Sequence, residues 1–148
     1  MTGDESAESQ KTLPLTRAGI RIAILAFLLD LVLVAVFVTI GRRSHDNPFD
    51  LLPWLRVLWP FGLGLLVAWV TSRAWRDPAA LWPAGVRVWV ITLLGAVGFR
   101  VISSQGIDPT FIAVGAAFLA LFLLGWRAIY WVITAAVRRR SPAQAAGE

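Results

Sequence analysis

The chain has 148 residues, of which 57% are hydrophobic, and its mean hydropathy is +0.69. A soluble domain of this size would need more polar surface than this composition leaves, so a soluble globular protein is excluded. The net charge of +5 comes mainly from arginines at the ends of apolar runs, a pattern that membrane topology requires and that gives no indication of nucleic-acid binding. The absence of cysteine excludes disulfides, cysteine-ligated metal sites and palmitoylation.

Four apolar runs follow one another along the chain. A spanning helix needs about 20 residues, and each run is close to that length. We expect helices over about 18–40, 54–71, 86–102 and 110–132, the last reaching 137 at most before Arg138–Arg140 stops it. The connections are short and polar, so neighbouring helices must be antiparallel. The predicted fold is therefore all-α: a polytopic membrane protein with four transmembrane helices in an up-down-up-down bundle. Pro60 predicts a kink in the second helix.

The chain divides into a disordered cytoplasmic tail (1–16), a four-helix transmembrane domain (17–137) and a second cytoplasmic tail (138–148). The orientation follows from the basic residues near the span ends, since the more basic side of a membrane protein faces the cytoplasm. That side carries Lys11, Arg17, Arg21, Arg73, Arg76, Arg87, Arg138, Arg139 and Arg140. We therefore expect a multi-pass protein of the plasma (inner) membrane with both termini in the cytoplasm.

Asp30 is the residue most relevant to function, because it lies within the apolar run from Ile22 to Ile40. A charged group at bilayer depth usually faces a partner or a cavity. Helix rise puts Asp30 about 15 Å from the start of its helix, close to the midplane. Arg127 and Arg100 are the basic residues well inside the spans and are its two candidate partners, and helix rise favours Arg127, whose height in the membrane is closer. The pair could be a structural ion pair or a proton or substrate relay, or Asp30 could be held neutral by hydrogen bonds.

The helix that carries Asp30 shows which way this carboxylate points. Steps of three and four residues place it on one face with small and apolar side chains: Ala23, Ala26, Val34, Phe37 and Gly41. Small residues let helices approach closely in lipid, so this face should pack into the bundle. Most of the eight tryptophans mark span ends as an interfacial belt, whereas Trp69 and Trp126 lie deeper and could stack against a ligand.

The loop after the first helix carries a second candidate, a polar cluster of Ser44, His45 and Asp46 on the outer side. Imidazole and carboxylate groups can bind a metal. The spacing matches no metal motif, however, and the chain has a single histidine. We interpret the cluster as a solvated loop, and we expect no metal, no cofactor and no catalytic residues.

Several short motifs between about Ala26 and Trp131 resemble a family of small bacterial four-helix membrane proteins that is catalogued only as a domain of unknown function. The matching residues are Asp30, Gly41–His45, Trp59-Pro60-Phe61, Arg73-Ala74-Trp75, Pro83, Gly85, Trp89, Arg100 and Gly125-Trp126-Arg127. The resemblance implies an integral membrane protein with no established activity, and it brings no catalytic residues.

These observations favour a non-enzymatic scaffold or accessory subunit that lies in the lipid bilayer and works in a homo- or hetero-oligomer. The alternative is a small proton-coupled transporter that uses the intramembrane Asp–Arg pair. A third hypothesis, a membrane enzyme acting on lipid or polyprenyl substrates, lacks the paired carboxylates that metal–pyrophosphate chemistry needs.

Overall fold

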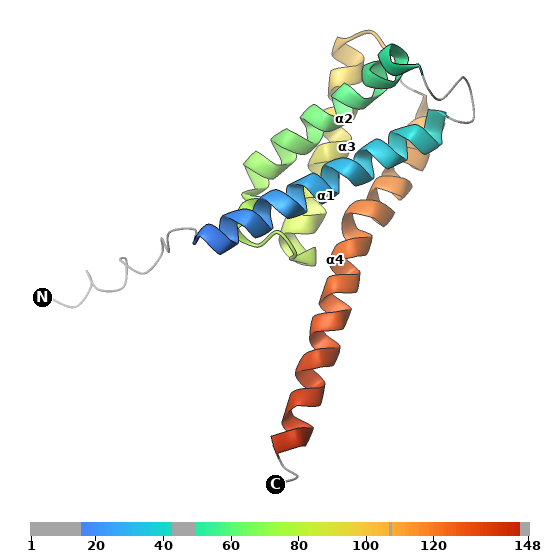
Figure 1. The fold of residues 1–148 in the computed structure, drawn as a ribbon. Coiled ribbons are helices and arrows are strands. Elements are labelled where there is room, and N and C mark those ends of the chain that lie inside the picture. Colours follow the sequence, from blue (N-terminus) through green and yellow to red (C-terminus); the bar gives the residue numbers. More distant parts are fainter. Residues whose placement is uncertain (1–15, 43–49, 107, 146–148) are drawn as a thin grey trace, which may run out of the picture.

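The computed structural model describes residues 16–42, 50–106 and 108–145, and within these ranges it holds helices and their connections but no strand (Figure 1). The elements in chain order are α1 (Arg17–Arg42), α2 (Leu51–Ser72), the 3₁₀ turn η1 (Ala74–Arg76), the π-helical turn η2 (Leu81–Gly85), α3 (Val86–Ile102) and α4 (Pro109–Ala145). The predicted outer-loop cluster of Ser44, His45 and Asp46 lies outside the described residues.

Four helices of the described part are long and apolar enough to cross a membrane, which confirms the predicted fold class. Their apolar spans are Arg17–Arg42, Leu51–Ser72, Leu81–Ile102 and Ile112–Arg139. Each helix packs against the next one in the chain, and α1 also packs against α4, so the four helices close into a bundle. The start of α1 and the end of α4 lie at the same end of the molecule, as an even number of spans requires (Figure 1).

The buried face of α1 is the one that its sequence spacing predicts. Ala23, Ala26, Asp30, Val34 and Phe37 are all buried, whereas Gly41, near the end of the helix, is exposed. The residues between them, such as Leu25 and Leu28, remain exposed and form the apolar outer surface of the helix. A period of 3.6 residues thus separates the side of α1 that meets the bundle from the side that meets lipid.

The backbones of α2 and α3 come into close contact at Gly64 and Gly95. A Cβ added at Gly64 would lie 2.7 Å from the carbonyl oxygen of Thr92, and one added at Gly95 would lie 2.9 Å from the Cα of Gly64. The two backbones therefore touch directly, which is the arrangement that small residues allow in membranes. α2 continues as one helix through Pro60, and the bend expected there stays a prediction.

The main difference from the sequence-based expectation lies in α4. Arg138–Arg140 was expected to stop this helix, but α4 continues to Ala145. Its 37 residues correspond to about 55 Å of helix. This length is well above the thickness of the hydrocarbon core of a bilayer, which is about 30 Å. Arginine is a good helix former, so a run of arginines ends the apolar span near Arg139 without ending the helix.

Candidate functional site

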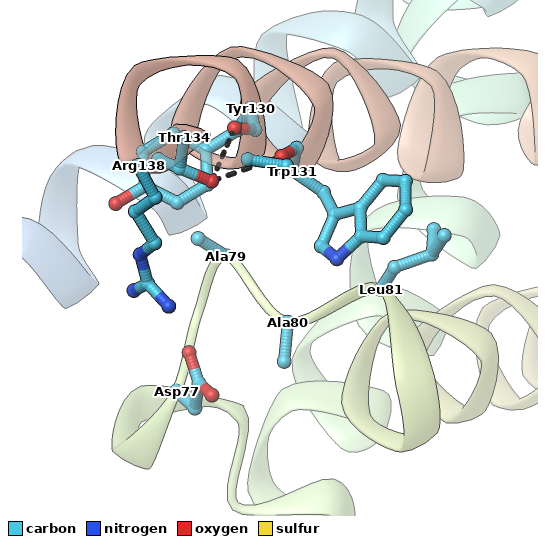
Figure 2. Close-up of a pocket in the computed structure, with 9 residues that line it drawn as sticks. Asp77, Ala79, Ala80, Leu81, Tyr130, Trp131, Thr134 and Arg138 are labelled. Atoms are coloured by element: carbon cyan, nitrogen blue, oxygen red, sulfur yellow. Dashed lines mark hydrogen bonds between the residues drawn. The ribbon is translucent and has the colours of Figure 1, made fainter. Parts of the chain in front are cut away.

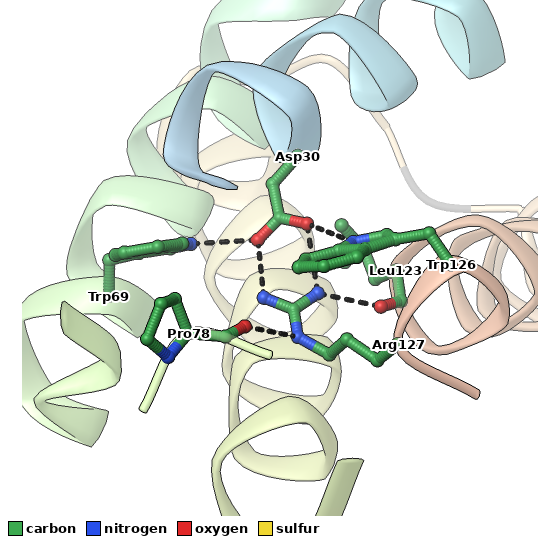
Figure 3. A network of polar contacts seen from close by, with 6 residues as sticks. All are labelled: Asp30, Trp69, Pro78, Leu123, Trp126 and Arg127. Atoms are coloured by element: carbon green, nitrogen blue, oxygen red, sulfur yellow. Dashed lines mark hydrogen bonds and ion pairs between the residues drawn. The ribbon is translucent and has the colours of Figure 1, made fainter. Parts of the chain in front are cut away.

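The carboxylate of Asp30 is fully buried where α1 meets α2 and α4, with an exposed fraction of 0% (Figure 3). It accepts four hydrogen bonds. The indole Nε1 of Trp69 donates to Oδ2 at 2.9 Å, and the indole Nε1 of Trp126 donates to Oδ1 at 2.8 Å. Arg127 supplies the other two, from Nη2 to Oδ2 at 2.7 Å and from Nη1 to Oδ1 at 2.9 Å. Each carboxylate oxygen therefore accepts from one indole and from one end of the guanidinium.

Arg127 reaches this carboxylate from the buried face of α4, where Gly115, Leu119, Leu123 and Arg127 recur every four residues. Its exposed fraction is 1%, and its two parallel bonds to Asp30 form the bidentate geometry that suits a buried ion pair. Nη1 also donates to the carbonyl oxygen of Leu123 at 2.6 Å, and the guanidinium carbon lies 4.4 Å from the centroid of the Trp126 ring. Packing and hydrogen bonds together fix the position of this arginine.

The segment 73–85, called here the α2–α3 connection, completes the site by contacting Arg127. The carbonyl oxygen of Pro78 accepts a hydrogen bond from Arg127 Nε at 3.1 Å. A Cβ added at Gly85 would lie 2.8 Å from Arg127 Cδ and 2.9 Å from the carbonyl oxygen of Ala80. The arginine side chain therefore passes over a position where only glycine leaves enough room.

The resulting site pairs two opposite charges and uses nearly all of their hydrogen-bonding groups. An ionised carboxylate has about four lone-pair positions, and Asp30 uses four. The guanidinium uses four of its five N–H groups on Asp30, Leu123 and Pro78. Since every bond of the carboxylate is to the protein, the site joins α1, α2, α4 and the connection. Removing two charges from water costs several kcal/mol each, and pairing with full hydrogen bonding offsets that cost.

The structure brings together some of the residues that the sequence singles out and separates others. Of the two arginines offered as partners, Arg127 meets Asp30, whereas Arg100 lies in the last turn of α3 and supplies none of the four described bonds to the carboxylate. Trp69 and Trp126 donate to Asp30 through their indole N–H groups. The described residues hold no group of three or more His, Cys, Asp or Glu side chains that could bind a metal ion.

The depth expected for Asp30 stays a prediction, but the structure shows which end of the bundle its carboxylate is closer to. Asp30 is thirteen residues into α1, near its middle, yet its partner Trp69 is only three residues from the end of α2 and Pro78 lies beyond that end. The carboxylate thus lies near the connection end of the bundle and not at the level of the middle of α2. Counting helix rise gives a depth only for helices that start at one level and run along the membrane normal, whereas spanning helices tilt.

Sequence reasoning missed three features of the site: the indole N–H donors to Asp30, the Pro78 carbonyl and the space left by Gly85. A signal for the first exists at Trp126, which lies well inside its span, whereas Trp69 is three residues from the end of α2. A buried indole N–H needs an acceptor, and Asp30 is a carboxylate in the middle of an apolar run. No pattern of side chains in the sequence indicates that the backbone carbonyl of Pro78 contributes to the site.

Replacing Trp69 with phenylalanine should lower the free energy of unfolding by about 1.5–3 kcal/mol, because a hydrogen bond to a charged group is lost inside the bundle. The ring contact with Phe27, whose centroid lies 5.3 Å away, can be kept by phenylalanine. Reversible unfolding in mixed detergent micelles measures the change. Trp82→Phe is the matched control, since the Trp82 side chain is exposed. Equal losses in both variants would contradict the role given to the Trp69 indole.

The comparisons with known proteins identify a family and bring no activity with it. The chain belongs to the family described as "Protein of unknown function (DUF3054)", whose model matches residues 27–130. The match covers both members of the ion pair and both indoles. Neither the curated proteins nor the solved structures contain a significant match to the chain.

Proposed function

We propose that this family member is a non-enzymatic membrane scaffold or accessory subunit, which works in the plasma membrane as part of a homo- or hetero-oligomer. The observation that carries the proposal is the closed Asp30–Arg127 site. Asp30 and Arg127 have exposed fractions of 0% and 1%, and every lone pair of the carboxylate has a protein donor. Such a site stabilises one arrangement of the helices, which is what a partner-binding subunit needs.

The competing function is a small proton-coupled transporter that uses the same pair. A carboxylate that relays protons must exchange them with water in a cavity or with a mobile partner. The direct bonds from Arg127, Trp69 and Trp126 leave no lone pair of Asp30 for that exchange in this arrangement. The geometry therefore supports a structural role for the pair over a relay.

Proton flux separates the two functions. The purified chain is reconstituted into liposomes that contain a pH-sensitive dye, and a pH gradient or a membrane potential is applied. We expect wild-type proteoliposomes to leak protons at the rate of protein-free liposomes. A higher wild-type flux that the Asp30→Asn variant abolishes would overturn the scaffold proposal in favour of transport. Because the first comparison uses the wild-type chain alone, it stands even if the variant fails to fold.

Assembly is the second requirement of the proposal. Extracted from its own membrane in a mild detergent, the chain should sediment as an assembly larger than its 16.2 kDa mass, after subtraction of bound detergent. Cross-linking in the intact membrane before extraction should preserve the same species. A monomer under both conditions would contradict the role of a subunit.

The orientation that we propose places the connection end of the bundle in the cytoplasm. Of the described arginines, Arg42, Arg56 and Arg100 belong to the opposite end, and the majority belong to the connection end: Arg17, Arg21, Arg73, Arg76, Arg87, Arg138 and Arg139. An alkaline phosphatase reporter fused after Glu148 should therefore be inactive, and the same reporter fused after Asn47 should be active. The reverse pattern would invert the proposed topology.

A further inference from the structure

A pocket of about 380 Å³ lies outside the ion-pair site, between the α2–α3 connection and the C-terminal half of α4 (Figure 2). The connection contributes Asp77 and the small apolar wall of Ala79 and Ala80. α4 contributes, among others, Trp131 and Arg138. In Figure 2 the Arg138 side chain extends from α4 to the same side as Asp77, and the indole of Trp131 lies at the other end of the pocket.

The ends of the neighbouring spans place this pocket at a boundary of the membrane. α2 ends at Ser72 and the next apolar span begins at Leu81, so the connection residues between them leave the hydrocarbon region. On α4 the apolar span ends at Arg139, one residue beyond Arg138. The exposed ring of Trp131 fits the same level, since tryptophan prefers the interface between hydrocarbon and water. The pocket is therefore located where phospholipid headgroups lie.

The pocket carries two opposite charges, those of Arg138 and Asp77, which do not pair with each other. Among the described residues Arg127 forms a salt bridge with Asp30, and none joins Arg138 to Asp77. The pocket thus places a guanidinium and a carboxylate near each other. Open space separates α4, which carries the guanidinium, from the connection, which carries the carboxylate. A guanidinium binds phosphate well, and a carboxylate accepts hydrogen bonds from an ammonium group. One ligand that carries both a phosphate and an ammonium would satisfy both side chains.

We propose that this pocket binds the headgroup of a zwitterionic aminophospholipid, phosphatidylethanolamine, taken from the bilayer around the protein. Arg138 binds the phosphate and Asp77 accepts an N–H bond from the primary ammonium. The apolar wall of Ala79 and Ala80, together with Trp131, lines the rest of the pocket. A headgroup without a primary ammonium leaves Asp77 without its donor, so the site distinguishes phosphatidylethanolamine from phosphatidylcholine, which has the same phosphate but no N–H.

Native mass spectrometry of the purified full chain tests the proposal, with equal amounts of the two lipids added to the detergent-solubilised protein. The wild type should bind phosphatidylethanolamine in preference to phosphatidylcholine. Arg138→Gln should weaken the binding of both lipids by about fivefold, because a basic residue near the membrane surface contributes about 1 kcal/mol to binding an anionic group. Asp77→Ala removes the acceptor, so it should leave phosphate binding intact and abolish the preference between the two lipids.

Arg139→Gln is the matched control, because it removes a neighbouring positive charge that does not line the pocket. Both arginines are exposed, as is Asp77, so the variants should fold like the wild type. Equal weakening by Arg138→Gln and Arg139→Gln would show general attraction to basic residues and overturn the proposal. The same conclusion would follow if the wild type bound both lipids equally, or if Asp77→Ala kept the preference.

Discussion

Replacing Asp30 with alanine should lower the free energy of unfolding by about 3–5 kcal/mol, the usual loss when one partner of a buried ion pair is removed. The reason is the position of Arg127, whose guanidinium is 1% exposed and would remain charged without its carboxylate. The indoles of Trp69 and Trp126 would lose their acceptor at the same time. Reversible unfolding in mixed detergent micelles measures the loss, and Asp50→Ala, at an exposed position, is the control.

The combination of Asp30→Leu with Arg127→Met should destabilise the bundle less than either single change does. Apolar residues of similar volume often replace a buried ion pair without loss, because no unpaired charge remains inside the protein. The two indole donors and the Pro78 carbonyl still lose their partners, so full recovery is not expected. Arg139→Met, an exposed change on the same helix, is the control. If the loss in the double variant equals the sum of the two single losses, the pair does not act as a unit.

The fold was predictable because hydrophobic length and periodicity are local properties of the sequence. The predicted helix 86–102 coincides with α3, and the spacing of Ala23, Ala26, Asp30, Val34 and Phe37 gave the buried face of α1. The end of α4 was not predictable from the same signal. Hydropathy marks where the apolar span stops, at Arg139, whereas helical structure depends on backbone propensity and continues to Ala145.

The pairing of Asp30 with an arginine was predictable from the sequence, whereas the other contacts of the site were not. A carboxylate within an apolar run needs a partner, and Arg127 and Arg100 were the two arginines well inside the spans. Helix rise favoured Arg127 slightly, but the contact itself depends on how α1 and α4 cross, which no local pattern in the sequence determines. The Pro78 carbonyl and the close approach at Gly85 belong to the path of the connection in space, so they emerge only once the bundle has formed.

Gly64→Ala should destabilise the bundle by about 1–3 kcal/mol, although alanine is the better helix former by about 1 kcal/mol. The new Cβ would lie 2.7 Å from the carbonyl oxygen of Thr92 and 3.0 Å from the backbone nitrogen of Ala96. Both atoms belong to the backbone of α3, so no side chain can rotate away, and α2 must separate from α3. Separation would remove the direct backbone contact between the two helices, including the approach of Gly95 to Gly64.

Gly62→Ala makes the same chemical change two residues away on α2, where a Cβ would have no atom within 4 Å. There the gain in helix propensity acts alone, so this variant should be neutral or more stable by up to about 1 kcal/mol. The expected sign therefore reverses between two neighbouring glycines of one helix. Unfolding in mixed micelles measures both changes, with Gly95→Ala and Gly98→Ala as the corresponding pair on α3. If Gly64→Ala were as stable as Gly62→Ala, the backbones of α2 and α3 would not be in contact at Gly64.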